Sequence, residues 1–409
     1  MNIPHECRAC GCRRWHLVLD LGSQPLANTL LCPEDLGQPE PSFPLRLALC
    51  GSCWLLQLTD AVPPTELFSN YVYFSSFSDA FLRHAADAVD KYRREFALGP
   101  ESFVVEIASN DGYLLKNFVA AGVPCLGIEP AANVATVAVK CGVPTVSRFF
   151  NHALAAELAE QGRRADLIIG NNVCAHVPDI NDFISGLAEL LKPSGRLVLE
   201  FPYACDLIEN FEFDTIYHEH VFYFTLTALM PLFARHRMEI IDVERLNIHG
   251  GSLRLHAAHR GTHVLQGRVA TLLAEEQMKG VASVDYYDRF SAGVRSIRDE
   301  LSKLMRELNA TGKTIAAYGA SAKGNTLLHY CGLGRETLDF VADRSTYKQG
   351  RFTPGKHLPI VASEELVKRQ PGYTLLLTWN FAEEILEQQS TYRKRGGKFI
   401  IPIPKVTVT

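Results

Sequence analysis

Phe103-Val-Val-Glu-Ile-Ala-Ser-Asn-Asp-Gly-Tyr-Leu-Leu115 is the stretch that decides the fold of this chain. Its first five residues are apolar apart from Glu106, which is the pattern of a strand buried on both faces in a parallel sheet. An Ala-Ser-Asn turn follows, and a helix is predicted to open at Asp111-Gly112. Small residues at such a turn let a ligand approach the backbone, and the first N–H groups of a helix are free to bind it. The sequence therefore predicts a ligand site at this βα turn of an α/β fold.

The charge of this turn separates it from a dinucleotide site. A dinucleotide fingerprint packs a pyrophosphate against several glycines, whereas this turn has one glycine and two acids, Glu106 and Asp111. A third acid, Glu129, ends the next predicted strand about twenty residues on, where it can accept the hydroxyls of a ribose. Carboxylates repel the negative charge of a diphosphate and attract a cation. The pattern therefore favours S-adenosylmethionine, which carries a sulfonium and an ammonium group.

The same stretch resembles the first motif of class I S-adenosylmethionine-dependent methyltransferases, a hydrophobic residue followed by E-I-G-x-N/S-D-G. Here the motif reads Val-Glu-Ile-Ala-Ser-Asn-Asp-Gly, with Ala108 where glycine is usual. The resemblance implies a Rossmann-like domain that holds the cofactor with Glu106, Asp111, Gly112 and Glu129. An ordinary βα turn of another α/β fold is the alternative.

Further βα units follow in the order that this class requires, with strands predicted at 143–150, 165–170 and 197–201. Asn171, Asn172 and His176 come just after the second of these strands. Because the carboxyl ends of strands border the ligand crevice of an open α/β sheet, these residues are expected beside the cofactor. Before the core, the stretch 67–76 is rich in aromatic and hydroxyl residues. We interpret it as a wall of the site, with Tyr73, Ser75 and Ser76 as candidates, and simple packing as the alternative.

Length and composition describe a folded chain of several domains. At 409 residues it is too long for one ordinary core, and 47% hydrophobic with 21% charged residues is typical of a globular protein. The net charge of −4 argues against nucleic acid as a main partner. No apolar run approaches the roughly 20 residues that span a bilayer, and no secretory signal is recognisable. A cytoplasmic protein is expected, and a monomer, although the sequence does not fix the oligomeric state.

Two CxxC pairs give the sharpest signal near the N-terminus. Cys7-Arg-Ala-Cys10 and Cys50-Gly-Ser-Cys53 supply four thiolates, which suit the tetrahedral geometry of a structural zinc ion. Four thiolates leave no open position for a substrate, so a catalytic metal is not expected. The alternatives are four unrelated core cysteines, or Cys12 as a substitute ligand.

The densest polar cluster is Tyr217-His-Glu-His220, between apolar flanks. Its histidines are two positions apart, unlike the i, i+4 spacing of helical zinc sites. An acid/base role fits better, because histidine titrates near neutral pH and the neighbouring Glu219 can orient it. An exposed polar loop is the alternative. A glycine turn at 247–252 follows, which either closes the site or is a plain hairpin turn.

After a long helical stretch over 264–309, a second strand, glycine-rich turn and helix begins at Thr314. Its turn, Tyr318-Gly-Ala-Ser-Ala-Lys-Gly-Asn325, has a lysine and no acid, which suits a phosphate at a helix N-terminus. Asp343 ends the next predicted strand, and Lys348 and Arg351 follow in a basic, turn-rich stretch. A smaller α/β domain with a diphosphate site is therefore expected, with a structural tail as the alternative.

Taken in this order, the cysteine pairs, the methyltransferase core, the Tyr-His-Glu-His cluster and the Tyr-Gly-Ala-x-Ala-Lys-Gly-Asn-Thr turn resemble the nucleotide-sugar 3-C-methyltransferases of deoxysugar biosynthesis. The resemblance covers essentially the whole chain. It implies an enzyme that removes the C3 proton of a nucleoside-diphosphate 4-keto-deoxysugar, dTDP being the expected nucleotide, and methylates the resulting enolate. His220 is the implied base, with Tyr217 as its partner or the alternative proton acceptor, and His218 is not expected to be catalytic.

The resemblance also implies the remaining site residues. Those implied for catalysis are Tyr73, His176, Tyr217, Glu219 and His220. Those implied for the cofactor are Glu106, Asp111, Gly112 and Glu129, with Asn171 and Asn172 at its rim and Ser75 and Ser76 in the wall. Those implied for the nucleotide diphosphate are Tyr318, Gly319, Ser321, Lys323, Asn325, Asp343, Lys348 and Arg351.

The expected fold is α/β in three parts. These are a small zinc-ribbon domain over 1–70, a class I methyltransferase domain over 71–300, and a smaller Rossmann-like, nucleotide-sugar-binding domain over 301–409. Two rival functions stay open. An O- or N-methyltransferase for a sugar or small metabolite would need only a base near a hydroxyl or amine, and a non-enzymatic zinc- and nucleotide-binding scaffold would not bind S-adenosylmethionine.

Overall fold

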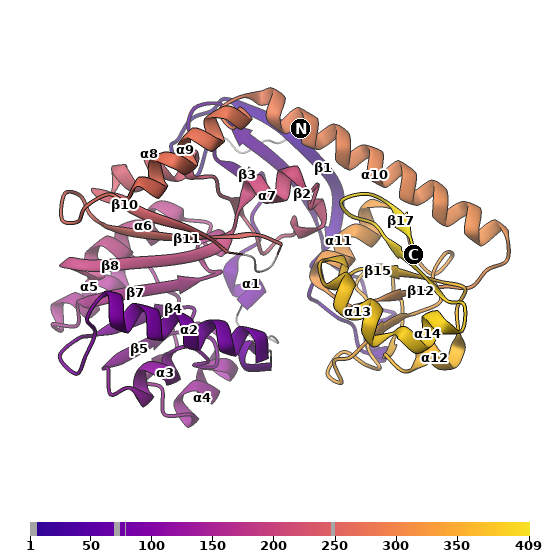
Figure 1. The fold of residues 1–409 in the computed structure, drawn as a ribbon, viewed down its shortest axis with the longest axis horizontal. Helices are drawn as coiled ribbons and strands as arrows, with labels where there is room; N and C mark the ends of the chain where they lie inside the picture. The colour runs from indigo at the N-terminus through magenta and orange to yellow at the C-terminus, as the bar shows by residue number, and fades with distance from the viewer. Residues whose placement is uncertain (1–5, 69–73, 78, 247–249) are drawn as a thin grey trace.

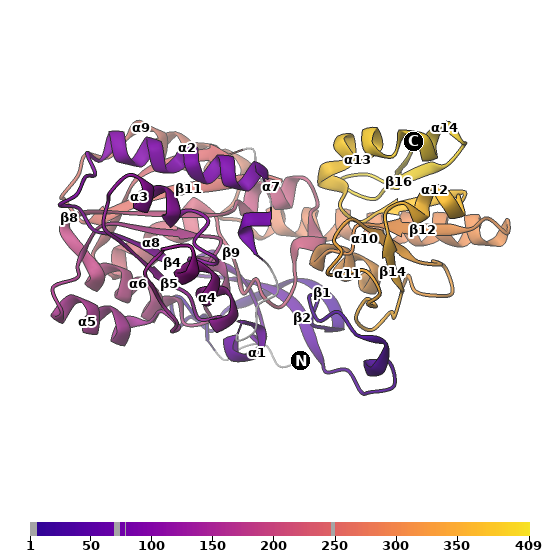
Figure 2. The same cartoon turned by 90° about the horizontal axis from the view of Figure 1, so that it is seen from below.

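A computed structural model describes residues 6–68, 74–77, 79–246 and 250–409 of the chain. Figure 1 shows two α/β lobes joined along the top by the long helix α10 (Val284–Ala310). The N-terminal strands β1 (Trp15–Pro25) and β2 (Ser42–Cys50) run between the lobes. The lobes remain apart in the view turned by 90° (Figure 2). Within the described ranges, no helix has the length and apolar character needed to cross a membrane.

The N-terminal strands form an antiparallel sheet that a later part of the chain completes. The strand order is β1-β2-β3-β9, in which β3 (Leu56–Leu58) pairs with β9 (Phe222–Tyr223). Leu56 pairs with Tyr223, and Gln57 with Phe222. Since β9 comes directly after the Tyr-His-Glu-His cluster, the N-terminal sheet borders that cluster.

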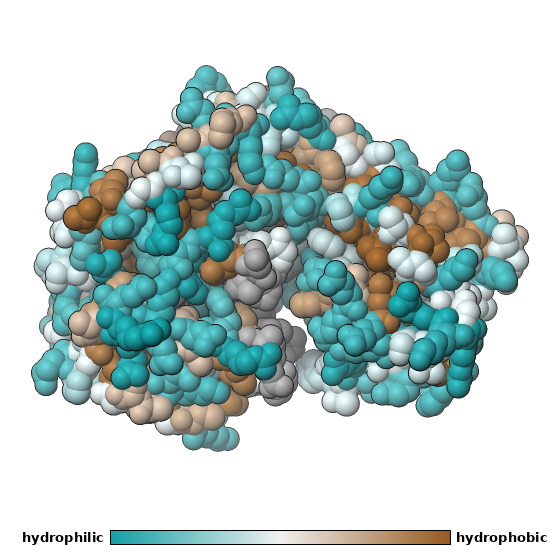
Figure 3. All heavy atoms as spheres, viewed as in Figure 1, coloured by the Kyte–Doolittle hydropathy of each residue, from teal (hydrophilic) through white to brown (hydrophobic). Residues whose placement is uncertain are grey.

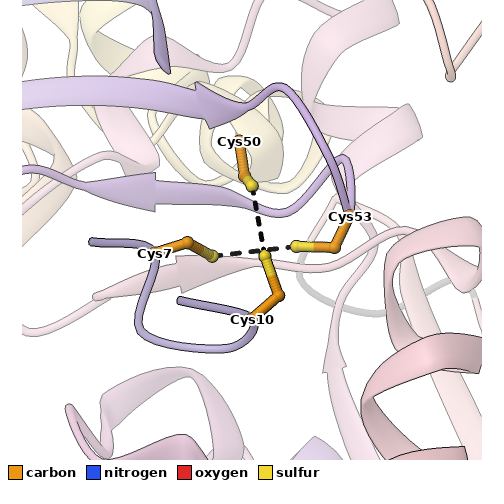
Figure 4. A group of neighbouring side chains, drawn as sticks. All are labelled: Cys7, Cys10, Cys50 and Cys53. Carbon is orange, nitrogen blue, oxygen red and sulfur yellow. Dashed lines mark hydrogen bonds between the residues drawn. The ribbon is translucent and has the colours of Figure 1, made fainter. Parts of the chain in front are cut away.

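Four cysteines gather at one end of this sheet (Figure 4). Their sulfurs all lie within 4.8 Å of one another, with 3.7 Å between Cys7 and Cys53 and 3.5 Å between Cys10 and Cys50. Zn–S bonds of about 2.3 Å in a tetrahedron place sulfurs about 3.8 Å apart, so the four residues fit the expected ion. The sulfur of Cys12 lies outside this group and accepts a backbone N–H instead.

The larger lobe is built on a sheet of order β10-β11-β8-β7-β4-β5-β6. The parallel strands are β4 (Val104–Ile107), β5 (Cys125–Ile128), β6 (Thr145–Val146), β7 (Ala165–Asn171) and β8 (Leu191–Pro202). The hairpin of β10 (Met238–Leu246) and β11 (Ser252–His259) adds an antiparallel edge. The strand order reverses between β4 and β7. Ligands bind at such a switch point, outside the carboxyl ends of the strands.

Helices cover both faces of this sheet (Figures 1 and 2). They are α2 (Asp79–Glu95), α3 (Leu115–Ala120), α4 (Ala132–Lys140), α5 (His152–Glu160), α6 (Ile180–Leu190), α7 (Ala204–Glu209), α8 (Leu226–Arg235) and α9 (Gly267–Lys279), with the short α1 (Pro64–Phe68) before them.

The smaller lobe repeats the doubly wound pattern, with strand order β14-β13-β12-β15-β16-β17. Here the order reverses between β12 and β15, which sets a second switch point. The strands are β12 (Ile315–Tyr318), β13 (Val341–Asp343), β14 (Ile360–Ala362), β15 (Tyr373–Leu376), β16 (Lys398–Ile401) and β17 (Thr407–Val408). The helices are α11 (Ala322–Tyr330), α12 (Glu365–Arg369), α13 (Ala382–Gln388) and α14 (Ser390–Lys394).

Three local expectations were wrong in detail. The helical stretch over 264–309 is broken into α9 and α10, because Gly280 ends α9 in the left-handed conformation, with φ of 80°. The strand predicted at 197–201 begins earlier, at Leu191 in β8, and its register with β7 jumps from Ala165↔Leu191 to Leu167↔Arg196. The helix expected at Asp111 begins at Leu115 instead.

The late start of α3 follows from the backbone of the preceding turn. Ala108, Asn110 and Gly112 all have positive φ, at 55°, 50° and 77°. A side chain at Gly112 would also meet Val143 Cγ2 at 2.9 Å. Glycine is usual at position 108 because it alone adopts positive φ freely, whereas alanine there costs about 1–2 kcal/mol.

Replacing Ala108 by Gly should therefore raise the free energy of unfolding by about 1 kcal/mol, because relief of the backbone strain exceeds the added entropy of the unfolded chain. Thermal unfolding followed by circular dichroism measures the effect. Ala292→Gly, at an exposed position within α10, is the matched control and should cost about 1 kcal/mol. Equal destabilisation by both substitutions would contradict the strain at Ala108.

Replacing Cys10 by Ser should abolish tight zinc binding and lower the thermal midpoint, because three thiolates and a hydroxyl hold the ion far less tightly. Structural zinc sites contribute on the order of 10 kcal/mol to folding, so a loss of several kcal/mol is expected. Elemental analysis of the purified protein measures the metal. Cys141→Ser, at an exposed cysteine, should retain one zinc ion per chain. Full zinc content in the Cys10 variant would disprove the site.

Candidate active site

The turn after β4 and the end of β7 bring acidic and amide oxygens together at the first switch point. In the described part of the chain, both carboxylate oxygens of Glu106, Oδ1 of Asp111 and Oδ1 of Asn171 are buried without a hydrogen-bond partner. Burial, and then the charges of Glu129 and Asp111, raise the pKa of Glu106 well above its usual value. A cation or hydroxyl donors would relieve this crowding, and a diphosphate would worsen it. The residues therefore fit S-adenosylmethionine.

Glu129 lies at the end of β5 and faces the same turn. Its Oε2 accepts the backbone N–H of Asn110 and its Oε1 that of Ala131, each at 2.9 Å. Burial raises the pKa of this carboxyl. A carboxylate oxygen has two lone pairs, so both oxygens retain capacity for the two hydroxyls of a ribose.

The predicted wall segment does reach this turn. The backbone N–H of Ser75 donates to Asn110 Oδ1 at 2.9 Å, and that of Ser76 donates to Asp111 Oδ2 at 3.2 Å. The serines therefore position the turn through their backbone. Tyr73 lies outside the described residues.

Tyr217 and His220 form a hydrogen-bonded pair. His220 Nε2 lies 3.0 Å from the Tyr217 hydroxyl, and His220 Nδ1 lies 3.1 Å from the carbonyl oxygen of Thr215. A carbonyl can only accept, so Nδ1 carries the proton and Nε2 offers its lone pair towards Tyr217. The backbone thus selects the tautomer in which the basic nitrogen faces the tyrosine.

His176 and Glu219 border this pair. His176 Nδ1 donates to the backbone carbonyl of Glu219 at 2.7 Å, and its ring centroid lies 4.9 Å from that of His220. Burial lowers the pKa of His176 to about 4, so this ring is neutral at pH 7. Glu219 Oε1 accepts Asn28 Nδ2 at 2.6 Å, and burial raises the pKa of Glu219 to about 7. His218, in contrast, is buried and its Nε2 lies 3.2 Å from the carbonyl of Phe43 in β2.

The glycine-rich turn of the smaller lobe lies near Asp214, three residues before Tyr217. Lys323 Nζ lies 4.3 Å from the ring centroid of Trp379, and the indole N–H of Trp379 donates to Asp214 Oδ2 at 2.7 Å. Gly319 has a φ of 93°, and a side chain there would lie 2.5 Å from Thr378 Oγ1. The turns that follow β12 and β15, the two strands at the switch point of the smaller lobe, therefore lie against each other.

The other residues predicted for the diphosphate make contacts within the protein. Ser321 caps α11 by accepting the N–H of Gly324 at 3.1 Å. Asp343 Oδ2 accepts the N–H of Ala320, and Lys348 Nζ donates to the carbonyl of Ala320, both at 2.7 Å. The remaining contacts are Tyr318 OH with Gln389, Asn325 Nδ2 with the Ala27 carbonyl, and Arg351 with the Tyr347 ring. Binding by these residues remains a prediction.

Contacts link the two switch points through His176 and His220. After β7 ends at Asn171, the chain enters the short helix Cys174–His176, and His176 contacts His220. His220 contacts the carbonyl of Thr215, and the neighbouring Asp214 accepts the indole N–H of Trp379 in the smaller lobe. Figure 3 shows the molecule notched between the lobes. Sequence reasoning missed Asn28, Asp214 and Trp379 as site residues, since no motif marks them.

Three family models match the chain in order. "Putative zinc binding domain" matches residues 7–68, "Methyltransferase domain" matches 81–242 and "C-methyltransferase C-terminal domain" matches 247–404. The protein "C-methyltransferase NovU" of Streptomyces niveus is 39% identical over 404 residues, 98% of this chain and 96% of that protein.

Other similarities cover part of the chain. A ubiquinone biosynthesis O-methyltransferase of Rhodopseudomonas palustris (strain TIE-1) is 27% identical over 181 residues, 41% of this chain and 66% of that protein. The crystal structure of magnesium protoporphyrin IX methyltransferase from Synechocystis PCC 6803 with bound SAM covers 46% of this chain and 86% of its own, with 17% identity and a TM-score of 0.34. The match to NovU extends through every part of the fold, so this chain belongs to the C-methyltransferase family.

Proposed function

We propose that this C-methyltransferase methylates C3 of a nucleoside-diphosphate 4-keto-deoxysugar, dTDP being the expected nucleotide. The observation that carries this proposal is the position of the Tyr217–His220 pair. It lies between an acidic turn suited to a cationic methyl donor and a lysine-bearing turn suited to a diphosphate. A nucleotide sugar with an acidic C–H bond would place its diphosphate at the lysine-bearing turn and that C–H bond at the Tyr217–His220 pair.

S-adenosylmethionine, when bound, supplies an electrophilic methyl group. The acids Glu106 and Asp111 would face its positive charge, and Glu129 would accept hydrogen bonds from its ribose. Gly112 allows the turn to form, because its φ is 77° and a side chain there would collide with Val143. Holding donor and acceptor in one orientation removes much of the entropic cost of their reaction.

His220 would act as the base. The C4 ketone acidifies the C3–H bond, and its proton passes to His220 Nε2, directly or through the Tyr217 hydroxyl. The electrons of the C3–H bond form an enolate with its charge on the C4 oxygen. C3 would then form a bond to the methyl group as the methyl–sulfur bond breaks, and the sulfur would keep that electron pair and leave as S-adenosylhomocysteine. The Thr215 carbonyl stabilises the imidazolium through Nδ1–H. Neutral His176 adds no positive charge that would weaken the base.

The smaller lobe would hold the nucleotide diphosphate. The helix N-terminus of α11, which Ser321 caps only at Gly324, and the Lys323 ammonium both favour an anion. Lys323 lies beside the ring of Trp379. The indole N–H of Trp379 donates to Asp214, three residues before Tyr217. A diphosphate bound there would place the attached sugar towards the histidine pair.

O-methylation is the rival activity, since O-methyltransferases match part of this chain. The C-methyltransferase relative matches the whole chain, including the smaller lobe. O-methylation requires no loss of a C–H proton, so proton exchange at carbon separates the two.

Wild-type protein should exchange the C3 hydrogen of a dTDP-4-keto-deoxysugar for deuterium in D₂O without S-adenosylmethionine, because the base acts before methyl transfer. His220→Asn should lower this exchange and methyl transfer by about 10²–10⁴-fold. Its amide can still donate to Thr215 while lacking a basic nitrogen at the Nε2 position. Mass spectrometry and NMR over a panel of nucleoside-diphosphate 4-ketosugars measure both reactions.

The matched control is His218→Gln, whose amide can keep the bond to Phe43. It should retain exchange, and both variants should bind S-adenosylmethionine in calorimetry. Methylation on oxygen, or undiminished exchange by His220→Asn, would reject the proposed chemistry.

Glu219→Gln should change the pH dependence of stability. The pKa of Glu219 is raised to about 7 by burial, so ionisation destabilises the fold as pH rises from about 4.5 through 7. The variant should thus gain stability over wild type across this window, by on the order of 3 kcal/mol above pH 7, and keep a constant difference below pH 4. Urea unfolding at several pH values measures this difference; a pH-independent difference would show that Glu219 titrates normally.

A further inference from the structure

We infer that Trp379 is a positioning residue for His220, acting from the smaller lobe through Asp214 and Thr215. The inference deepens the proposed function, since it rests on His220 being the base. Neither Trp379 nor Asp214 belongs to a motif of the sequence. Their contact joins parts of the chain 165 residues apart.

Trp379 lies at the switch point of the smaller lobe, the second switch point of the molecule. It begins the short helix Trp379–Phe381, just after β15, and its indole N–H donates to Asp214 Oδ2 at 2.7 Å. Asp214 has no exposed surface, so no water competes for this bond at the carboxyl. The indole N–H therefore has a fixed acceptor in the larger lobe.

Asp214 lies in the middle of the single helical turn Phe213–Thr215. The carbonyl of the next residue, Thr215, accepts the Nδ1–H of His220 at 3.1 Å. The smaller lobe also holds the residue after it, because Thr326 Oγ1 donates to the Ile216 carbonyl at 3.2 Å. The smaller lobe therefore contacts both neighbours of Thr215, at the side chain of Asp214 and at the backbone carbonyl of Ile216.

The direction of the Thr215 carbonyl decides which nitrogen of His220 carries the proton. With Nδ1–H on this carbonyl, Nε2 is the basic nitrogen and faces Tyr217. If the turn loosened, Nδ1 would lose its acceptor, and the imidazole would distribute its proton between both nitrogens. The Lys323 ammonium lies over the same indole, at 4.3 Å from the ring centroid. The proposed diphosphate site and the proposed base therefore share one side chain.

Trp379→Phe tests the inference, because it removes the N–H donor and keeps an aromatic ring beside Lys323. We measure ¹⁵N NMR of the histidine side chains without substrate, identifying the His220 signals by their loss in His220→Asn. Wild type should show His220 with a protonated Nδ1, and Trp379→Phe should show a mixture of tautomers. In turnover with S-adenosylmethionine and a dTDP-4-keto-deoxysugar, kcat should fall about ten- to hundredfold while KM stays within about threefold.

Two further variants keep the test decisive. Thr326→Val removes the bond to the Ile216 carbonyl and should shift the His220 signals in the same direction with less risk to folding. Trp15→Phe is the matched control, since the Trp15 indole N–H is buried without a partner among the described residues, and it should leave the His220 signals unchanged. Unchanged His220 signals in both Trp379→Phe and Thr326→Val would overturn the inference.

The NMR measurement uses no sugar substrate, so it separates this inference from the proposed function. A wild type that fails to exchange the C3 hydrogen would reject the proposed chemistry, while the tautomer measurement would still decide whether Trp379 positions His220.

Discussion

Val221 fixes residues 217–220, the segment proposed for catalysis, through its two backbone groups. Its N–H donates to the carbonyl of Ala175 in the larger lobe, and its carbonyl accepts the N–H of Leu58 in the zinc-binding sheet, both at 2.8 Å. Val221 is buried, so both groups must be paired within the protein. Residues 217–220 immediately precede it and are therefore held between the short helix Cys174–His176 and the N-terminal sheet. A zinc ion held by the four cysteines would stabilise this sheet, and through it the position of residues 217–220.

In the proposed function, opposite charges in the two lobes would separate the methyl donor from the nucleotide of the acceptor. Glu106, Asp111 and Glu129 lie together at the switch point between β4 and β7. Burial, and then the charges of the neighbouring carboxylates, raise the pKa values of Glu106 and Glu129. The turn after β12 presents Lys323 instead. A cationic donor and an anionic acceptor would each find the complementary side, and neither would be favoured in the other's place. His176, which burial keeps neutral at pH 7, and His220 lie between these two sites.

The sequence predicted the βα turns well because each depends on neighbouring residues. The apolar run before Glu106 and the small residues after it specify a strand and a turn wherever they occur, and the strand order of both lobes followed the expected units. Ala108 marked a departure from the usual motif, and its positive φ explains why glycine is usual there. Element boundaries were less predictable, since the start of α3 and the break at Gly280 depend on individual backbone conformations.

What the sequence by itself determined is the chemistry available: four thiols spaced for zinc, acids suited to a cationic cofactor, and a tyrosine and histidine three residues apart. Tertiary structure alone decided which of these groups meet. Asn28 reaches Glu219 across 191 residues, and Trp379 reaches Asp214 across 165. Such contacts leave no local pattern, because they form only where separately folded sheets pack together. Burial then lowers the pKa of His176 and raises that of Glu219. The sequence does not predict these shifts, because burial depends on how the chain packs.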